Sequence, residues 1–143
     1  MDTNIVSLKF DEIEIGLEKS FQIEILESML DTFSELSGDV NTLHMEKKYA
    51  ISQGFEHRVC HGMLLGSFIS RLIGMYLPGK HALYFSQSLN FINPCYPNDN
   101  ITISGKILDK SDATKIITIK TIIKNQSNKI IVEGIARVKI RDD

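Results

Sequence analysis

Three polar side chains that can handle protons occur within six residues, in the segment S-G-D-V-N-T-L-H. Asp39 provides a carboxylate, Asn41 an amide and His44 an imidazole. A carboxylate and an imidazole beside one water molecule can take a proton from it and deliver a proton elsewhere, because histidine titrates near pH 6.5. The alternative is structural: Asp39 caps a turn, Asn41 or Thr42 caps a helix, and His44 is exposed to solvent.

A second candidate group is the dipeptide His61-Gly62, at the start of an apolar, helix-length run. The first N–H groups of a helix have no partner inside it, and the helix dipole adds partial positive charge there. The backbone N–H of Gly62 can therefore stabilise a developing oxyanion. The alternative is that this helix start binds only a cap.

Other chemistries have little support in the sequence. The histidines have no metal-ligand spacing, and the two cysteines do not form a C-x-x-C pair. Ser70 is not in a G-x-S-x-G nucleophile elbow, so we expect it to hydrogen-bond inside a pocket. We predict neither a metal ion nor a cofactor.

The run from Gly62 to Leu77, which ends at Pro78, predicts a long buried helix because it is apolar on nearly every side. It is too short and too interrupted by polar residues to span a membrane. Small residues recur along it at i+4 spacing and form one stripe. They are Gly62, Gly66, Ser70 and Gly74. The stripe predicts either tight packing of the helix on a sheet or a groove for a thin, flexible ligand.

The remaining chain predicts one strand and two short helices before this helix, and strands after it. Alternating hydrophobicity indicates a strand over 20–25, and helical periodicity indicates helices over 27–36 and 45–52. The later strands are predicted over 83–92, 101–108, 115–124 and 130–140. Short turns between them indicate a four-strand meander, and so an α+β fold with an antiparallel sheet wrapped around the helix. Open strand edges predict a homodimer.

Composition narrows the class of protein. The chain has 143 residues, 43% of them hydrophobic, with a formal charge of −2 and a pI near 6.1. We therefore expect one soluble domain over residues 1–143, with neither nucleic acid nor a membrane as partner. The first residues, M-D-T-N, lack the features of a signal peptide, so a cytoplasmic location is expected.

The combination of S-G-D-V-N-T-L-H with the later H-G-M-L-L-G-S resembles the MaoC-like dehydratases, and most nearly the (R)-specific enoyl-CoA hydratases. The resemblance continues through L-P-G-K and Q-S-L-N-F, so it covers nearly the whole chain. It implies the hot-dog fold, an antiparallel β-sheet wrapped around a long central α-helix, with a short helical overhang that carries the active site. It also implies a homodimer with the acyl tunnel close to the dimer interface.

The resemblance also implies the roles of individual residues. Asp39 and His44 match the catalytic dyad, and Gly62 matches the glycine whose N–H polarises the thioester carbonyl. The substrate-binding residues that it implies are Asn41, His61, Met63, Ser70, Ile73 and Val138. Two departures stand out: Thr42 replaces a proline of the family pattern, and Arg71 adds a charge to the central helix.

The predicted reaction is syn addition of water to a trans-2-enoyl thioester, which makes the protein a hydro-lyase. Asp39 is the expected base and His44 the expected acid, although the two groups could share the water. The alternatives are a hot-dog acyl thioesterase, which would release free thiol, and a non-catalytic acyl-thioester-binding subunit. The thioester carrier, coenzyme A or acyl carrier protein, stays open at this point.

Overall fold

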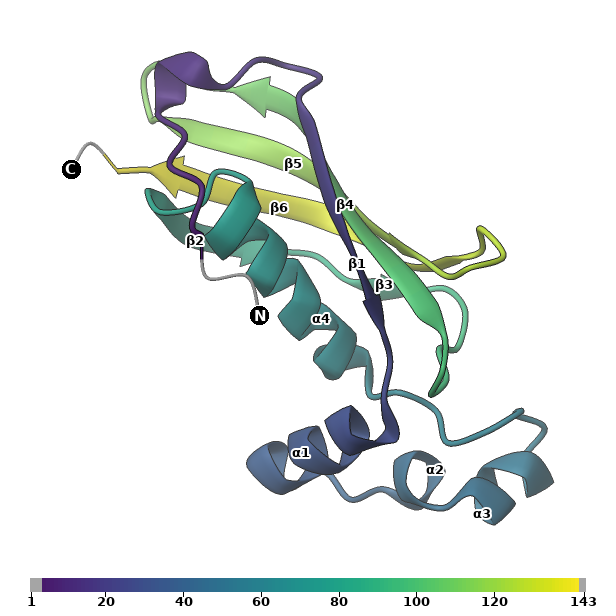
Figure 1. Ribbon diagram of the computed structural model, residues 1–143. Helices are drawn as coiled ribbons and strands as arrows, with labels where there is room; N and C mark the ends of the chain where they lie inside the picture. The colour runs from purple at the N-terminus through teal and green to yellow at the C-terminus, as the bar shows by residue number, and fades with distance from the viewer. Residues whose placement is uncertain (1–3, 142–143) are drawn as a thin grey trace.

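The computed structural model describes residues 4–141 (Figure 1). The first three residues, part of the segment from which the absence of a signal peptide is predicted, lie outside this range. In chain order the elements are η1 (Phe10–Glu12), β1 (Glu18–Glu24), α1 (Glu27–Ser37), α2 (Thr42–Met45), α3 (Lys47–Ser52), α4 (Gly62–Arg71), the π-helical turn η2 (Leu72–Tyr76), β2 (Ala82–Gln87), β3 (Asn90–Phe91), β4 (Asn100–Lys110), β5 (Ile116–Lys124) and β6 (Ile130–Ile140).

All strands belong to one antiparallel sheet with the order β1-β4-β5-β6-β2, and β3 also pairs with β6. The last three strands form a meander as predicted, but the four-strand meander is wrong. β2 joins the far side of β6, and β1 takes the place beside β4. The chain after β3 crosses the end of the sheet: Ile92 still bonds to Ile131, whereas Asn98 already bonds to Ile25 beside β1. The short turn predicted between these strands gives no indication that the chain crosses the end of the sheet there.

The sheet wraps around α4 and η2, as predicted for this α+β chain (Figure 1). From the helix, Leu65, Ile69, Leu72 and Ile73 are buried against the sheet. The strands contribute alternate residues, because successive side chains point to opposite faces. Those from β4 to β6 include Ile101, Ile103, Ile107, Ile117, Ile119, Ile123, Val132, Ala136, Val138 and Ile140. No helix within residues 4–141 is long and apolar enough to cross a membrane.

The prediction that α4 is buried on every side is wrong for the single chain. Met63, Ser67, Ser70 and Gly74 are exposed on one face of the helical segment. The predicted close packing along the stripe is therefore limited. A side chain added at Gly74 would meet no atom within 4 Å. The exposed face of the helix lies beside the edge strand β2.

Helices α1 to α3 form an overhang that projects from one end of the sheet (Figure 1). α1 ends at Gly38, which has the left-handed conformation that favours glycine (φ +79°). Inside the overhang, the guanidinium of Arg58 donates to Asp31 at 2.6 Å and to the backbone oxygen of His44 at 2.7 Å. This buried arginine joins α1 to α2 and so fixes the shape of the overhang.

Both ends of the overhang attach to the same crossing loop. At its start, Ile25 and Asp99 share a backbone hydrogen bond of 2.8 Å, and the N–H of Asn98 donates to Ile25 at 2.7 Å. At its end, the N–H of Cys60 donates to the backbone oxygen of Cys95 at 2.8 Å. The overhang is therefore held against the sheet at one place.

Candidate active site

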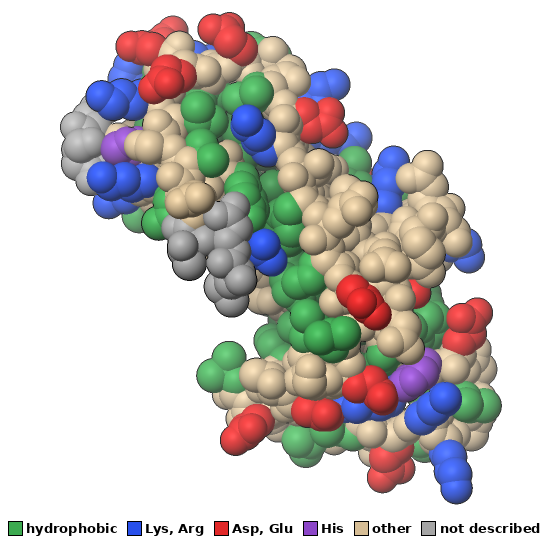
Figure 2. Space-filling view, in the orientation of Figure 1, with side chains coloured by type: hydrophobic (Ala, Val, Ile, Leu, Met, Phe, Trp, Pro, Cys, Tyr) green, Lys and Arg blue, Asp and Glu red, His purple; other side chains and the backbone are tan. Residues whose placement is uncertain are grey.

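A cavity of about 700 Å³ lies between the overhang, the start of α4 and the crossing loop. Figure 2 shows this face of the molecule hollowed above the overhang, with hydrophobic side chains around the hollow. The cavity walls are mainly apolar and sulfur-containing. The lining residues include Asp39, His44, His61, Gly62, Met63, Phe91 and Cys95.

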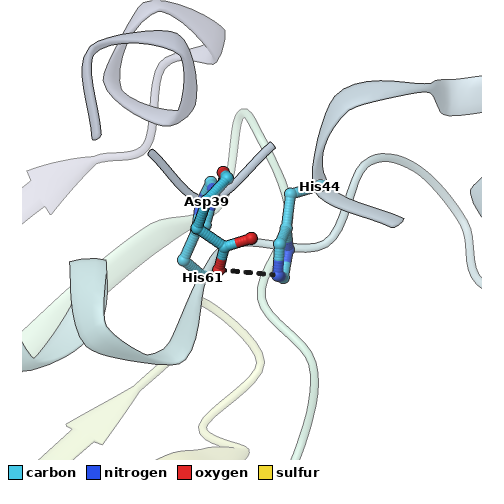
Figure 3. Close-up of side chains that lie close together, drawn as sticks. All are labelled: Asp39, His44 and His61. Carbon is cyan, nitrogen blue, oxygen red and sulfur yellow. Dashed lines mark hydrogen bonds and ion pairs between the residues drawn. The ribbon is translucent and has the colours of Figure 1, made fainter. Parts of the chain in front are cut away.

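The carboxylate of Asp39 and the imidazole of His44 face one another in this cavity (Figure 3). Asp39 Oδ2 lies 4.0 Å from His44 Nε2, which is too far for a direct hydrogen bond. His44 Nδ1 lies 2.6 Å from the backbone oxygen of Val59. Because a carbonyl only accepts, Nδ1 carries a proton, and in the neutral ring Nε2 is an acceptor that faces the carboxylate.

The predicted structural roles are also present. Asp39 Oδ1 accepts the N–H of Asn41 at 3.1 Å, and the Asn41 side chain caps α2 by accepting the N–H of Leu43 at 3.0 Å. However, the His44 side chain is only 18% exposed, so the expectation of a surface histidine is wrong. The loop thus uses one carboxylate oxygen for its turn and leaves the other for the cavity. Asn41 supports this loop and does not line the cavity.

His61 lies beneath the pair and is 2% exposed. Its ring stacks on the His44 ring with 4.0 Å between centroids and 26° between planes. His61 Nε2 lies 3.1 Å from the backbone oxygen of Asp39, whereas Nδ1 is buried and has no hydrogen-bond partner within residues 4–141. Burial lowers the pKa of His61 and so favours the neutral ring.

Asp39, His44 and His61 offer ligand atoms within 4.8 Å of one another, the kind of cluster that could hold a metal ion. The geometry suits an ion poorly. A ligating imidazole holds its metal near its own ring plane, and an ion between two stacked rings lies outside both planes. In addition, His61 Nε2 already faces a carbonyl oxygen. We therefore assign no metal to this cluster.

Gly62 is the first residue of α4, as predicted, and lines the cavity opposite the pair. No hydrogen bond of its N–H occurs within the described part of the chain. A Cβ atom at this position would lie 2.7 Å from the ring of Phe91. Only glycine therefore lets the helix start and this ring approach so closely.

Several predicted substrate-binding residues lie elsewhere in the single chain. The side chains of Ile73 and Val138 belong to the core, at 1% and 0% exposure, and Ser70 is exposed on the open face of α4. None of the three lines the cavity. Their contact with the acyl chain stays a prediction; in the single chain the side chains of Ile73 and Val138 fill the helix–sheet core. Met63 does reach the cavity rim.

The two departures from the family pattern leave the cavity unchanged. The Arg71 guanidinium lies over the ring of Phe21, 4.3 Å from its centroid, and donates to the Tyr76 hydroxyl at 3.2 Å. Arg71 therefore points towards β1 and away from the site. Thr42 begins α2 directly after its cap, Asn41.

Sequence reasoning missed the contribution of β3 and the crossing loop that follows it. Phe91 and Cys95 line the cavity although they follow Gly62 by about thirty residues. Contact with Cys60, together with burial, raises the pKa of the Cys95 thiol, so this wall stays uncharged. No local pattern signals these contacts, because the topology of the sheet creates them.

Comparison with known proteins agrees with this arrangement. The sequence model of the MaoC-like domain matches residues 10–129. The (R)-specific enoyl-CoA hydratase of Aeromonas caviae is 34% identical over 128 residues, covering 90% of this chain and 96% of that protein. A mitochondrial 3-hydroxyacyl-[acyl-carrier-protein] dehydratase of Arabidopsis thaliana is 34% identical over 108 residues, covering 73% of this chain and 64% of that protein.

The structure of an R-hydratase from Pseudomonas aeruginosa, in its unliganded form, superimposes with a TM-score of 0.91. It is 30% identical in sequence, and the match covers 97% of this chain and 89% of that one. The likeness therefore includes both the sheet around the helix and the overhang.

Proposed function

Because this chain belongs to the MaoC-like domain family and is a lyase of the hydratase and dehydratase type with a hot-dog fold, we propose that it reversibly adds water to a trans-2-enoyl thioester. The product is an (R)-3-hydroxyacyl thioester. One observation carries the proposal: Asp39 Oδ2, His44 Nε2 and the helix start at Gly62 converge on one mainly apolar cavity.

The distance between the two catalytic groups matches one bridging water molecule. A water oxygen about 2.8 Å from each of two atoms that are 4.0 Å apart subtends an angle near 90°. Such a water is held at one point by both groups. Its oxygen is then directed to C3 of an enoyl chain lying in the cavity.

In the proposed reaction, Asp39 and His44 each transfer one proton. In hydration, the Asp39 carboxylate accepts a proton from the water as its oxygen bonds to C3. The imidazolium form of His44 donates its Nε2 proton to C2 on the same face, while Nδ1–H stays on the Val59 carbonyl. A second water returns the proton from Asp39 to His44. The thioester already activates C3, so the reaction requires no cofactor.

The thioester carbonyl binds at the N–H of Gly62. Negative charge develops on its oxygen as water adds, and a positioned backbone N–H at a helix start stabilises that charge. The apolar walls strengthen this interaction, because electrostatic interactions are larger in a medium of low polarity.

The test compares trans-crotonyl, trans-octenoyl and branched enoyl thioesters, each on coenzyme A and on acyl carrier protein. Loss of the enoyl-thioester absorbance measures hydration, and chiral analysis identifies the (R)-product. A thiol reagent detects free thiol at the same time. Release of thiol without loss of the double bond would identify a thioesterase. Binding without either change would identify a binding subunit.

The proposed working unit is a homodimer. In the single chain, exposed apolar side chains gather on the edge strand β2 and near the open face of α4. They include Met63, Leu83, Phe85, Phe91 and Ile92. Two of them, Phe91 and Met63, also line the cavity, so a second copy seated there would close the substrate site.

A further inference from the structure

In the described part of the chain, two buried histidines each lie within hydrogen-bond distance of a serine hydroxyl. His61 Nε2 lies 3.0 Å from Ser34 Oγ, beside the cavity. His81 Nε2 lies 3.0 Å from Ser7 Oγ, beyond the opposite end of α4. The two histidines are buried to a similar degree, at 2% and 4% exposure. Only the first pair touches the residues that carry the proposed reaction.

The partners of His61 fix its tautomer. The backbone oxygen of Asp39, 3.1 Å from Nε2, can only accept, so Nε2 carries the proton. The Ser34 hydroxyl donates its own proton to Met45 Sδ at 3.0 Å, which leaves its oxygen free to accept from Nε2 as well. This network joins α1, the Asp39 loop, α2 and the start of α4.

The charged and titratable groups that face His61 are Asp39, His44 and Arg58. Two of these can be cationic, and the ring itself is buried, so a proton on Nδ1 would place a further positive charge in an enclosed site. A neutral His61 instead presents an uncharged ring face to His44, 4.0 Å away. His44 then gains or loses its proton without a charged neighbour beneath it.

We propose that Ser34 and His61 form a positioning pair for the catalytic dyad. The neutral His61 ring holds the Asp39 peptide through Nε2–H and supports the His44 ring by stacking, which keeps Oδ2 and Nε2 one water molecule apart. The inference rests on the proposed hydratase function. It replaces direct substrate binding, the role predicted for His61, with an indirect one.

The first test separates positioning from binding. His61→Phe keeps a stacked ring but removes the N–H donor, so kcat is expected to fall about a hundredfold, the effect of misplacing a reacting group by about 1 Å. KM should stay unchanged, because His61 does not hold the substrate. His61→Gln, which restores an N–H, should recover part of kcat. Ser34→Ala should lower kcat less, because the bond from Nε2–H to Asp39 remains.

The matched control is His81→Phe, which removes the other buried histidine with a serine partner. It should lower the melting temperature and leave kcat and KM unchanged. Equal losses of kcat in the His61 and His81 variants would overturn the proposal, because the effect would then be general destabilisation. A wild-type kcat in folded His61→Phe would overturn it as well, and so would a rise in KM alone.

A second test requires no turnover. NMR of the wild-type protein with ¹⁵N-labelled histidine should show His61 protonated at Nε2 and still neutral at pH values where free histidine is already charged. The backbone N–H of Asn41, which donates to Asp39 Oδ1, should exchange faster with solvent in His61→Phe. A His61 ring protonated at Nδ1 would overturn the proposal. An Asn41 N–H that exchanges at the same rate in wild type and in His61→Phe would overturn it as well. If wild type hydrates no thioester, the proposed function fails, and these two readouts still decide the positioning.

Discussion

At the scale of single residues, the two oxygens of the Asp39 carboxylate have different partners. Oδ1 belongs to the loop, through the N–H of Asn41, and Oδ2 belongs to the cavity, opposite His44. A structural role and a chemical role therefore coexist in one side chain. Substitutions can separate them, because an amide keeps an acceptor for the turn but cannot take a proton.

Asp39→Asn and His44→Ala are each expected to lower hydration at least about a hundredfold, with melting temperatures near that of wild type. The double variant should be little worse than the poorer single variant, because one water serves both groups. Steady-state rates with crotonyl-CoA and thermal unfolding provide the two measurements. Folded single variants with nearly full activity would return both residues to a purely structural role.

The lowered pKa of His61 predicts a pH-dependent stability. Above pH 6.5 the ring is neutral in both the folded and the unfolded state. Below it, the unfolded state binds the proton more readily, so this stability contribution is lost as pH falls, by at most about 1.4 kcal/mol per pH unit. Between pH 7 and 5 the unfolding free energy of wild type should therefore fall more steeply than that of His61→Phe. Urea unfolding across this range measures the difference, and parallel curves would contradict it.

Local turn signals singled out Asp39, His44 and the helix start at Gly62, and the family resemblance implied that they share one site; all three line one cavity. Ser34 and Arg58 could not be found in this way. Their partners, His61 and Asp31, are each 27 positions away. A serine in a helix gives no sign that it is buried. Ser34 is buried, whereas the apolar side chain of Leu36 in the same helix is 84% exposed.

At the scale of elements, the start of α4 allows the role of the Gly62 N–H to be tested directly. Proline is well tolerated at the first position of a helix, and His61 already has the extended conformation that a following proline requires (φ −59°, ψ 134°). Gly62→Pro should therefore keep the helix but remove the N–H.

The matched control is Gly62→Ala, which crowds Phe91 in a similar way and keeps the N–H. We expect kcat for Gly62→Pro to be about 10²–10³-fold below that for Gly62→Ala, the usual effect of losing one oxyanion donor. Stopped-flow or steady-state hydration rates measure the ratio. Equal rates in the two variants would mean that the carbonyl binds elsewhere.

The positions of Ile73 and Val138 in the core lead to another expectation. Ile73→Ala should cost about 2–5 kcal/mol of stability, because it leaves a cavity among buried side chains. The preference between crotonyl and octenoyl thioesters should not change. Unfolding in urea and competition between the two substrates measure both effects. A clear shift towards longer chains would instead show that the acyl chain enters the core.

The strands β4, β5 and β6 were predictable because their hydrophobic alternation is regular, and their short turns bring neighbours together. The segment 83–92 was predicted as one strand but forms β2 and β3, with a bulge between Tyr84 and Ser86. Its place beside β6 depends on the route of the crossing loop. Alternation identifies a strand and says nothing about which edge of the sheet it joins.

At the scale of the whole molecule, the apolar edge of the sheet predicts self-association. Leu83 and Phe85 alternate along β2 and are 46% and 55% exposed. Phe85→Lys should shift the proposed dimer towards monomer and reduce hydration, because the cavity would lose its cover. Sedimentation equilibrium at micromolar concentration measures the first effect.

The matched control is Ile15→Lys, which places the same charge at an exposed isoleucine outside the sheet. It should leave both assembly and activity unchanged. A wild-type chain that sediments only as a monomer would contradict the proposed homodimer.

The attachment of both overhang ends to one loop makes the segment from Leu26 to Val59 an exchangeable cassette. Its boundary hydrogen bonds, at Ile25 and Cys60, are between backbone atoms and do not depend on the side chains inside it. The corresponding segment of a relative could therefore be transplanted without altering the register of the sheet. The cassette carries Asp39, His44 and part of the cavity wall, whereas Gly62 and Phe91 remain with the recipient. Chimaeras would thus show how much of the acyl selectivity comes from the transplanted segment and how much from the recipient.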